Sequence, residues 1–426
     1  MLPTVIGYSQ VLARLAIGLN EQPHLIAHVF KKVSDEGERE SLPERAASTI
    51  QKALTACLSD RSGFVRPNSL EGKRVGLYVL TNICLKILFK CNNTRNIENI
   101  FVGLGGTTAP PLRIFPWPER VTYLFYLGRY LFTTNHFYRA SLVLEEAFNS
   151  CSPKRLRQRR LILIYLTTSN IICGRFPSQS LYNLPEANGF RERFAPICRA
   201  INHGDLQEFR RVMDYQNQYT SWFLQLGLLL PITNRCEVLV YRSLFRRTFM
   251  LVGYQPGPNS KGAPSLELKY VTHVAQWMEQ RARLGASSQT STNRSNWIFK
   301  EQRLRPLKQE AAYDDLNADE LEGLTNADSR KPAPSPLEVE FTAGSLVTQG
   351  LINGYISHKT KRVAILGAKK GDAVLIGFPS PWRVIRDRCE ADGQGNVPGW
   401  KKDVGAPVGF MGRVVTLSGV KPIGQT

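Results

Sequence analysis

The stretch LINGYISHKTKRVAIL, residues 351–366, decides the fold class that we predict for this chain. Two β-prone runs flank a polar tip, His-Lys-Thr-Lys, and this arrangement is typical of a hairpin. Before it we expect an amphipathic helix over residues 265–283, and then a short strand or turn followed by a second helix over 337–354. Helix, helix and basic hairpin in this order indicate a winged-helix module.

The N-terminal part of the chain reads as a succession of amphipathic helices. In VGLYVLTNICLKILF, residues 75–89, apolar residues recur at helical spacing and Lys86 falls on the polar side. Short turn signals separate the later helices, and antiparallel helix pairs of this kind are typical of a repeat array. The later helices are expected over residues 120–132, 137–149, 156–172, 191–200, 206–215 and 232–252.

One of these helix pairs matches the tetratricopeptide (TPR) pattern. Leu127-Gly128, Ala140, Ala147 and Pro153 fall at or within one residue of the offsets that this repeat requires. Gly and Ala at such positions let two helix backbones approach closely. No other stretch matches as well, so the sequence predicts an irregular, TPR-like helical solenoid.

The expected organisation is a mainly α chain in which this solenoid precedes the winged-helix module. Residues 285–335 are rich in Ser, Thr, Asn and charge and include an acidic stretch, 310–328, so we expect a disordered acidic insertion there. The divisions are an N-terminal helical segment (1–74), the helical repeats (75–252), the winged-helix part (253–284 and 336–380), the insertion (285–335) and a C-terminal extension (381–426).

The charge balance narrows the classes of partner. The chain carries 55 Lys and Arg against 35 Asp and Glu, a formal net charge of +20. A surplus of this size indicates a polyanionic partner, such as nucleic acid, an acidic protein or an anionic membrane surface. The eight cysteines are scattered, which excludes a zinc knuckle and a disulfide framework. Apolar runs fall short of the roughly 18–20 residues that span a bilayer, so we expect a soluble intracellular protein.

Two basic clusters are candidate interfaces. The first lies at the start of the helix expected over 156–172, where cations oppose the helix dipole and therefore have no local stabilising role. It is a candidate site for an acidic peptide or a phosphate backbone, and the alternative is a solvated helix end in which Arg160 packs its stem within the array. Its candidate partner-binding residues are Lys154, Arg155, Arg157 and Arg159.

The second cluster lies at the predicted wing, where Lys and Arg supply affinity for phosphates. An exposed hairpin tip would also be polar by default, and we favour phosphate contact. Three further arginines recur at helical spacing opposite apolar residues, as a partner-binding face or simply a polar helix face. The candidate nucleic-acid-binding residues are Lys359, Lys361, Arg362, Lys369 and Lys370, and the further arginines are Arg242, Arg246 and Arg247.

Nothing in the sequence favours catalysis. The six histidines are scattered, and His24 and His28, four residues apart, have no acidic or cysteine ligand placed with them. The chain has no Gly-Lys-Ser/Thr phosphate loop, no Gly-x-Ser-x-Gly elbow and no His-x-His signature. We therefore expect no catalytic residue, no metal site and no cofactor. The dense aromatic residues follow helical periodicity, which favours core packing over base stacking.

Five runs resemble the PCI domain, named for subunits of the proteasome lid, the COP signalosome and initiation factors. They are most similar to the Thp/PCID-type subunit of the second transcription-and-export (TREX) complex and to its paralogue, the twelfth COP signalosome-associated subunit. The runs are RVTYLFYLGRYLF (120–132), RLILIYL (160–166), FAPICRAINHGDLQEF (194–209), VYRSLFRRTF (240–249) and LINGYISHKTKRVAIL (351–366).

The resemblance implies a non-catalytic scaffold subunit for nuclear mRNA export coupled to transcription. It implies three partners: a larger PCI-domain subunit, a small acidic disordered subunit shared with the proteasome lid, and RNA or DNA. It places the protein in the nucleus at the nuclear pore, with the cytoplasm as a second location. The alternative is a protein–protein adaptor associated with the COP signalosome or the proteasome lid. The insertion and the long tail depart from the family pattern and leave the choice between the two paralogues open.

Overall fold

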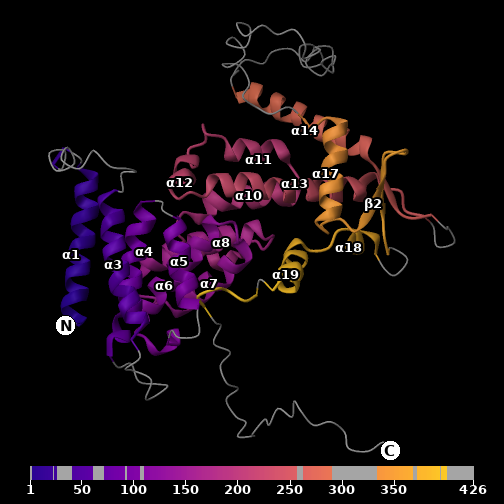
Figure 1. The fold of residues 1–426 in the computed structure, drawn as a ribbon. Helices are drawn as coiled ribbons and strands as arrows, with labels where there is room; N and C mark the ends of the chain where they lie inside the picture. Colours follow the sequence, from indigo (N-terminus) through magenta and orange to yellow (C-terminus); the bar gives the residue numbers. More distant parts are fainter. Residues whose placement is uncertain are drawn as a thin grey trace, which may run out of the picture.

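The computed structural model describes residues 2–22, 24–25, 41–60, 72–91, 94–105, 110–256, 262–289, 333–367, 372–393 and 395–400. Helices dominate these residues, so the predicted mainly α fold is confirmed. Figure 1 shows the helices following one another from α1 at one end to the small β-sheet at the other. The array consists of α1 (Leu2–Glu21), α3 (Leu42–Leu58), α4 (Leu77–Lys90), α5 (Thr94–Gly105), α6 (Trp117–Thr133), α7 (Phe137–Ser150), α8 (Leu156–Ile172), α9 (Gln179–Tyr182), α10 (Phe190–His203), α11 (Leu206–Met213), α12 (Thr220–Gln225) and α13 (Leu229–Val252), with short 3₁₀ turns at Gly72–Gly76, Leu112–Ile114 and Pro185–Ala187.

The TPR-like pair is α6 and α7, and its small residues have the expected role. Gly128 lies against Leu144, and a Cβ atom at Gly128 would come within 2.5 Å of the Leu144 Cγ atom. Ala140 and Ala147 are fully buried at the same crossing. Only residues without a bulky side chain allow two helices to approach this closely. The close helix crossing predicted from sequence is therefore present.

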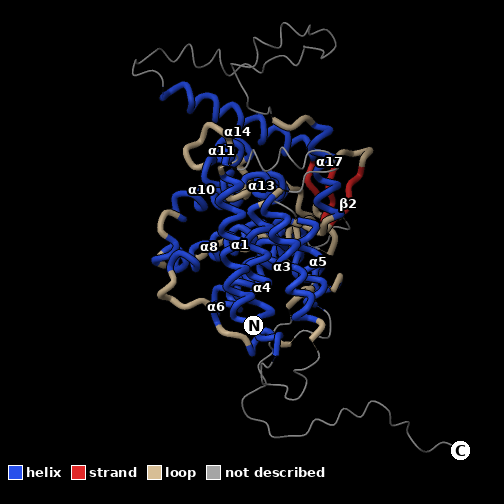
Figure 2. Tube along the Cα trace, turned by 60° about the vertical axis from the view of Figure 1, so that its left-hand side comes forward, coloured by secondary structure: helices blue, strands red, loops and turns tan. Residues whose placement is uncertain are grey.

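The winged-helix part follows α13. It consists of β1 (Ser265–Glu267), α14 (Leu268–Gln289), α17 (Pro336–Thr348), β2 (Gly354–Ser357) and β3 (Arg362–Ile365). The strands form an antiparallel sheet in the order β1-β3-β2, with Leu266 opposite Val363 and Ile356 opposite Val363. Figure 2 shows these strands confined to one side of the molecule beside α17. The predicted hairpin and the predicted winged-helix module are both confirmed.

Two local expectations in this part are wrong. Ser265–Glu267 forms a strand rather than the first turn of the amphipathic helix, because its backbone pairs with β3. The residues after 337 do not begin with a strand or turn, because a capping box between Ser335 and Glu338 starts α17 at Pro336. Both differences change the local structure within the winged-helix part and leave its expected bounds as they were.

The chain after the wing returns to the helical array. It contains α18 (Ala373–Gly377) and α19 (Pro381–Ala391). The Tyr138 hydroxyl on α7 donates a 2.9 Å hydrogen bond to Glu390 of α19, and the rings of Tyr138 and Trp382 lie 5.9 Å apart. Further on, Gly399 has a positive φ of 85° and packs against α5 and α6. Residues 381–393 and 395–400 therefore attach the end of the winged-helix part to the solenoid.

Some expectations fall outside the described residues. These are Lys369 and Lys370 and nearly all of the acidic insertion, since α14 ends at Gln289 and the description resumes at residue 333. The structure also shows that α1 is long and apolar enough to cross a membrane, by length and composition alone. The expectation that apolar runs fall short of a membrane span is therefore wrong for α1 by this criterion. Core helices of soluble proteins and signal sequences meet the same criterion, and only 17% of the α1 window is buried, on the face where Ser9, Ala13 and Ala16 pack against α3 and α4.

Candidate nucleic-acid and partner interfaces

The wing tip lies between β2 and β3 and projects its basic side chains outward. His358, Lys359 and Lys361 are all exposed. Lys361 takes a positive φ of 52°, which the turn requires, and its carbonyl oxygen accepts a hydrogen bond from the amide of Leu268 at the start of α14. The tip is therefore held by the first helix of the module, and its side chains face solvent.

Two of the three described lysines and arginines at the wing have a carboxylate partner within the module, and Lys361 is the first of them. Glu340, on α17, is almost fully buried and lies 2.6 Å from Lys361 Nζ and 2.6 Å from His358 Nδ1. Hydrogen bonds from Lys361 and then from His358 hold the pKa of the Glu340 carboxyl below its ordinary value. Lys361 is therefore exposed to solvent and at the same time stabilises the module through its ion pair with Glu340.

Arg362 is engaged in a similar way. Its guanidinium pairs with Glu267 of β1, which also lies 2.5 Å from Lys269 Nζ. The hydrogen bonds from Lys269 and Arg362 lower the pKa of the Glu267 carboxyl. Among the described residues of the wing, Lys359 is thus the cation without an ion-pair partner. The wing is less basic than its sequence indicates.

The helix in the recognition position of the module, α17, is not basic. In a helix-turn-helix fold the second helix enters the major groove and reads bases with polar and cationic side chains. Pro336–Thr348 contains no Lys or Arg, and it exposes 75% of Leu337 and 80% of Phe341. This surface is suited to an apolar protein partner. The lack of Lys and Arg in residues 336–348 is visible in the sequence itself, so this property of the helix could have been predicted without the structure.

The cationic run at the start of α8 divides into two groups. Lys154, Arg155 and Arg157 are exposed. Arg159 is instead packed inward, where its Nε donates a 2.8 Å hydrogen bond to buried Glu186 and its Nη1 donates one of 2.7 Å to the carbonyl of Cys151. Arg160 donates to the carbonyls of Glu186 and Asn188, which matches the packed stem expected for it. Arg159 is therefore a structural residue, because its guanidinium is already bound within the chain.

The arginines of α13 do not form one surface. Arg242 is only 9% exposed, and its guanidinium donates hydrogen bonds to the carbonyls of Phe378 and Pro379. Burial, with a smaller effect of Arg246, lowers its pKa to about 10, so it remains charged at neutral pH. The expected polar or partner-binding face therefore does not include Arg242. Arg246 is half-buried, and the exposed Arg247 donates a 3.2 Å hydrogen bond to the carbonyl of Asn202.

No arrangement typical of an active site stands out in the part of the chain that the structure describes. No group of three or more His, Cys, Asp or Glu is placed there to hold a metal ion. Burial raises the pKa of the cysteine thiols, to about 12 for Cys84, Cys173 and Cys198. These thiols are protonated at neutral pH and are poor nucleophiles.

Comparisons with known proteins give related sequences, whereas no family model matches the chain. A PCI domain-containing protein of Schizosaccharomyces pombe is 28% identical over 234 residues, which is 54% of this chain and 49% of that protein. A PCI domain-containing protein 2 homolog of Dictyostelium discoideum is 25% identical over 271 residues, 64% of this chain and 56% of its own. A CSN12 homolog of Neurospora crassa is 26% identical over 223 residues, 52% and 47% of the two chains. The chain spans about half the length of the curated relatives it matches.

Proposed function

We propose that this chain, a PCI-domain scaffold protein of the Thp/PCID type, is a non-catalytic subunit of a nuclear complex that couples transcription to mRNA export. In this role it binds a second, larger PCI-domain subunit, a small acidic subunit, and RNA or DNA. The observation that carries the proposal is the pairing of a TPR-like array with a winged-helix module that presents two separate kinds of surface, one cationic and one apolar.

The cationic surfaces suit the polyanionic partners. Lys359 at the wing tip, with Lys369 and Lys370 close by in sequence, would contact phosphates. Such contacts are independent of base sequence, because they read charge alone. Lys154, Arg155 and Arg157 at the start of α8 would contact the acidic subunit. The array and the wing would then hold different partners at the same time.

The apolar surface on α17 suits the second PCI-domain subunit. Leu337 and Phe341 lie four residues apart on one face of the helix and are largely exposed. Contact with a partner would remove both side chains from water. Large exposed apolar side chains beside one another are typical of protein interfaces.

The same observation favours a second candidate function. A winged helix whose recognition helix has no cation would also serve a protein–protein adaptor associated with the COP signalosome or proteasome lid. In that case the positive charge of the chain would serve acidic protein surfaces. Three of the relatives carry the name CSN12 homolog, which supports this alternative.

Affinity purification of the tagged full chain from nuclear extract, with and without nuclease, separates the two functions. Export and nuclear-pore factors among the recovered proteins would support the first, and signalosome subunits would support the second.

The double variant Leu337→Asp/Phe341→Asp should lose the second PCI-domain subunit. A matched double variant of exposed leucines elsewhere, Leu224→Asp/Leu230→Asp, should retain it. Recovery of neither set of proteins by the parent chain would contradict both functions.

A further inference from the structure

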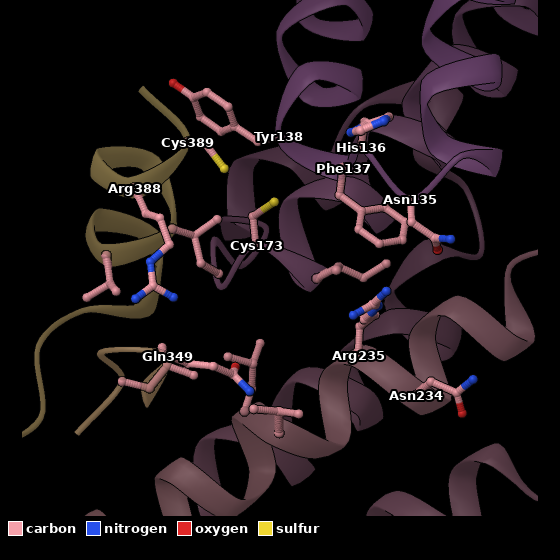
Figure 3. Close-up of a pocket in the computed structure, with 16 residues that line it drawn as sticks. Asn135, His136, Phe137, Tyr138, Cys173, Asn234, Arg235, Gln349, Arg388 and Cys389 are labelled. Carbon is pink, nitrogen blue, oxygen red and sulfur yellow. The ribbon is translucent and has the colours of Figure 1, made fainter. Parts of the chain in front are cut away.

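A pocket of about 340 Å³ lies where the helical array meets the chain that follows the wing (Figure 3). Its walls come from the start of α7, the end of α8, the middle of α13, the residues after α17, and α19. Apolar side chains form its floor, among them Val238, Leu239, Leu351 and Ile385. The pocket therefore lies where the solenoid, the winged-helix part and α19 meet.

The lining of the pocket is positively charged. Arg235 of α13 and Arg388 of α19 reach it from different walls, and none of the sixteen lining residues is acidic. Arg235 has no hydrogen bond or ion pair with any described residue, whereas Arg388 donates one hydrogen bond of 3.0 Å to the carbonyl of Thr348. Both guanidinium groups thus keep donors for a ligand.

The acidic residues on the same two helices are engaged elsewhere. Glu237 pairs with Arg210 at 2.8 Å, and Asp387 pairs with Arg386 at 2.8 Å. Glu390 accepts the hydrogen bond from Tyr138. Glu237 and Asp387 are each balanced by an arginine, whereas Glu390 keeps its charge at the edge of the pocket, so the two lining arginines leave a net positive charge for an external anion.

Side-chain amides at the pocket indicate a peptide rather than a free anion. Asn135 and Asn234 are exposed there, and Gln349 donates through Nε2 to Ser345, which leaves its Oε1 as an acceptor. Amides provide donors and acceptors together, as peptide backbone requires. The two thiols that line the pocket have raised pKa values, because Cys173 is buried and Cys389 is partly buried, so they contribute neither negative charge nor a nucleophile.

We propose that this pocket binds an acidic peptide segment that places a hydrophobic side chain on the apolar floor and flanking carboxylates against Arg235 and Arg388. A volume of about 340 Å³ is at the lower end of ligand pockets, which suits one or two side chains of a peptide. Because three parts of the fold line the pocket, the peptide would hold them together. The proposal rests on the scaffold function proposed above and gives its acidic partner a second docking point, besides the cations at the start of α8.

The test uses the purified full chain and a fluorescein-labelled peptide in which Asp and Glu alternate with Leu and Phe, measured by fluorescence anisotropy. The peptide should bind, and Arg235→Gln should weaken binding about tenfold, because a charge-assisted hydrogen bond is lost. Arg388→Gln should weaken it similarly, with its melting temperature measured because Arg388 also contacts Thr348. Arg199→Gln, an exposed arginine of α10 outside the pocket, is the matched control and should bind as the parent does.

Three results of the peptide titrations would overturn the pocket assignment. These are no binding of the acidic peptide, equal affinity of the parent and Arg235→Gln chains, or equal affinity for a peptide with Asn and Gln in place of Asp and Glu. Displacement of the peptide by single-stranded RNA, with the loss of RNA affinity in Arg235→Gln, would also overturn it in favour of nucleic acid. None of these results depends on which proteins copurify with the chain, so the proposed scaffold function stands or fails separately.

Discussion

The guanidinium of Arg242, in α13, donates a 2.8 Å hydrogen bond to the carbonyl oxygen of Phe378, which lies 136 residues further along the chain. A second hydrogen bond, of 2.6 Å, goes to the carbonyl of Pro379. These two bonds connect the last long helix of the solenoid to the residues that end the winged-helix part. The arginine therefore fixes how the two parts meet.

Arg242→Met should lower the free energy of unfolding by about 3 kcal/mol, because methionine fills the space but leaves one buried and one partly buried carbonyl without a charged donor. Urea denaturation measures the change. Arg247→Met, an exposed position on the same helix, should change stability by less than about 0.5 kcal/mol. Equal effects of the two substitutions would show that the Arg242 bonds contribute little.

The cationic run at the start of α8 gives a second matched comparison. Arg159→Met should destabilise the chain by about 3–5 kcal/mol, because it leaves the Glu186 carboxylate buried without its partner. Arg157→Met should leave stability unchanged and weaken binding of the acidic subunit. Thermal denaturation and a binding titration on both variants separate the two roles. A stable Arg159→Met chain would contradict the structural role assigned to this arginine.

The different roles of Arg157 and Arg159 could not be predicted from the sequence. The stretch 154–160 reads as one cationic cluster because local composition is uniform, and only the tertiary position of Glu186 separates Arg159 from Arg157. Arg242 is similar, since helical spacing places it on a polar face but its carbonyl partner at Phe378 lies 136 residues away. Long-range partners of this kind leave no local pattern.

Other features were predictable because the pattern that specifies them is local. The hairpin at 354–365 follows from β-prone runs around a polar tip, and the crossing at Gly128 follows from small residues at fixed offsets. The strand β1 has no such signal, because three residues carry too little pattern and the strand exists only through its pairing with β3. The junction pocket has none either, because its lining comes from five separate segments of the chain.

The Glu340 cluster gives the wing a dependence on pH. The folded-state pKa of this carboxyl is below its ordinary value, so its ionised form contributes stability above that ordinary value, 4.5. The contribution is lost as the pH falls through the lower, folded-state pKa. Between pH 7 and about pH 3.5, Glu340→Gln should therefore lose less stability than the parent chain does. Urea midpoints at both pH values measure the difference, and Glu192→Gln, an exposed position on α10, serves as the control. Parallel losses in Glu340→Gln and the parent would refute the account.

The hydroxyl of Tyr123, in α6, should fasten the C-terminal residues to the array. It donates a 2.8 Å hydrogen bond to the carbonyl of Gly399. Tyr123→Phe should cost about 1 kcal/mol and speed amide hydrogen exchange in residues 395–400. Tyr126→Phe, on the same helix, is the control, because its hydroxyl makes no hydrogen bond with a described residue. Unchanged exchange in Tyr123→Phe would show that other interactions hold this segment.

A salt titration of single-stranded RNA binding tests most directly whether the lysines at and near the wing contact nucleic-acid phosphates, as proposed above. The parent chain should bind less tightly as salt rises. The triple variant Lys359→Gln/Lys369→Gln/Lys370→Gln should reduce the slope of log K against log salt by about 2, at roughly 0.7 for each phosphate that is no longer neutralised. A control triple variant in the array, Lys52→Gln/Lys86→Gln/Arg113→Gln, removes the same charge and should keep the parent slope. Equal slopes for the parent and the wing variant would contradict the claim.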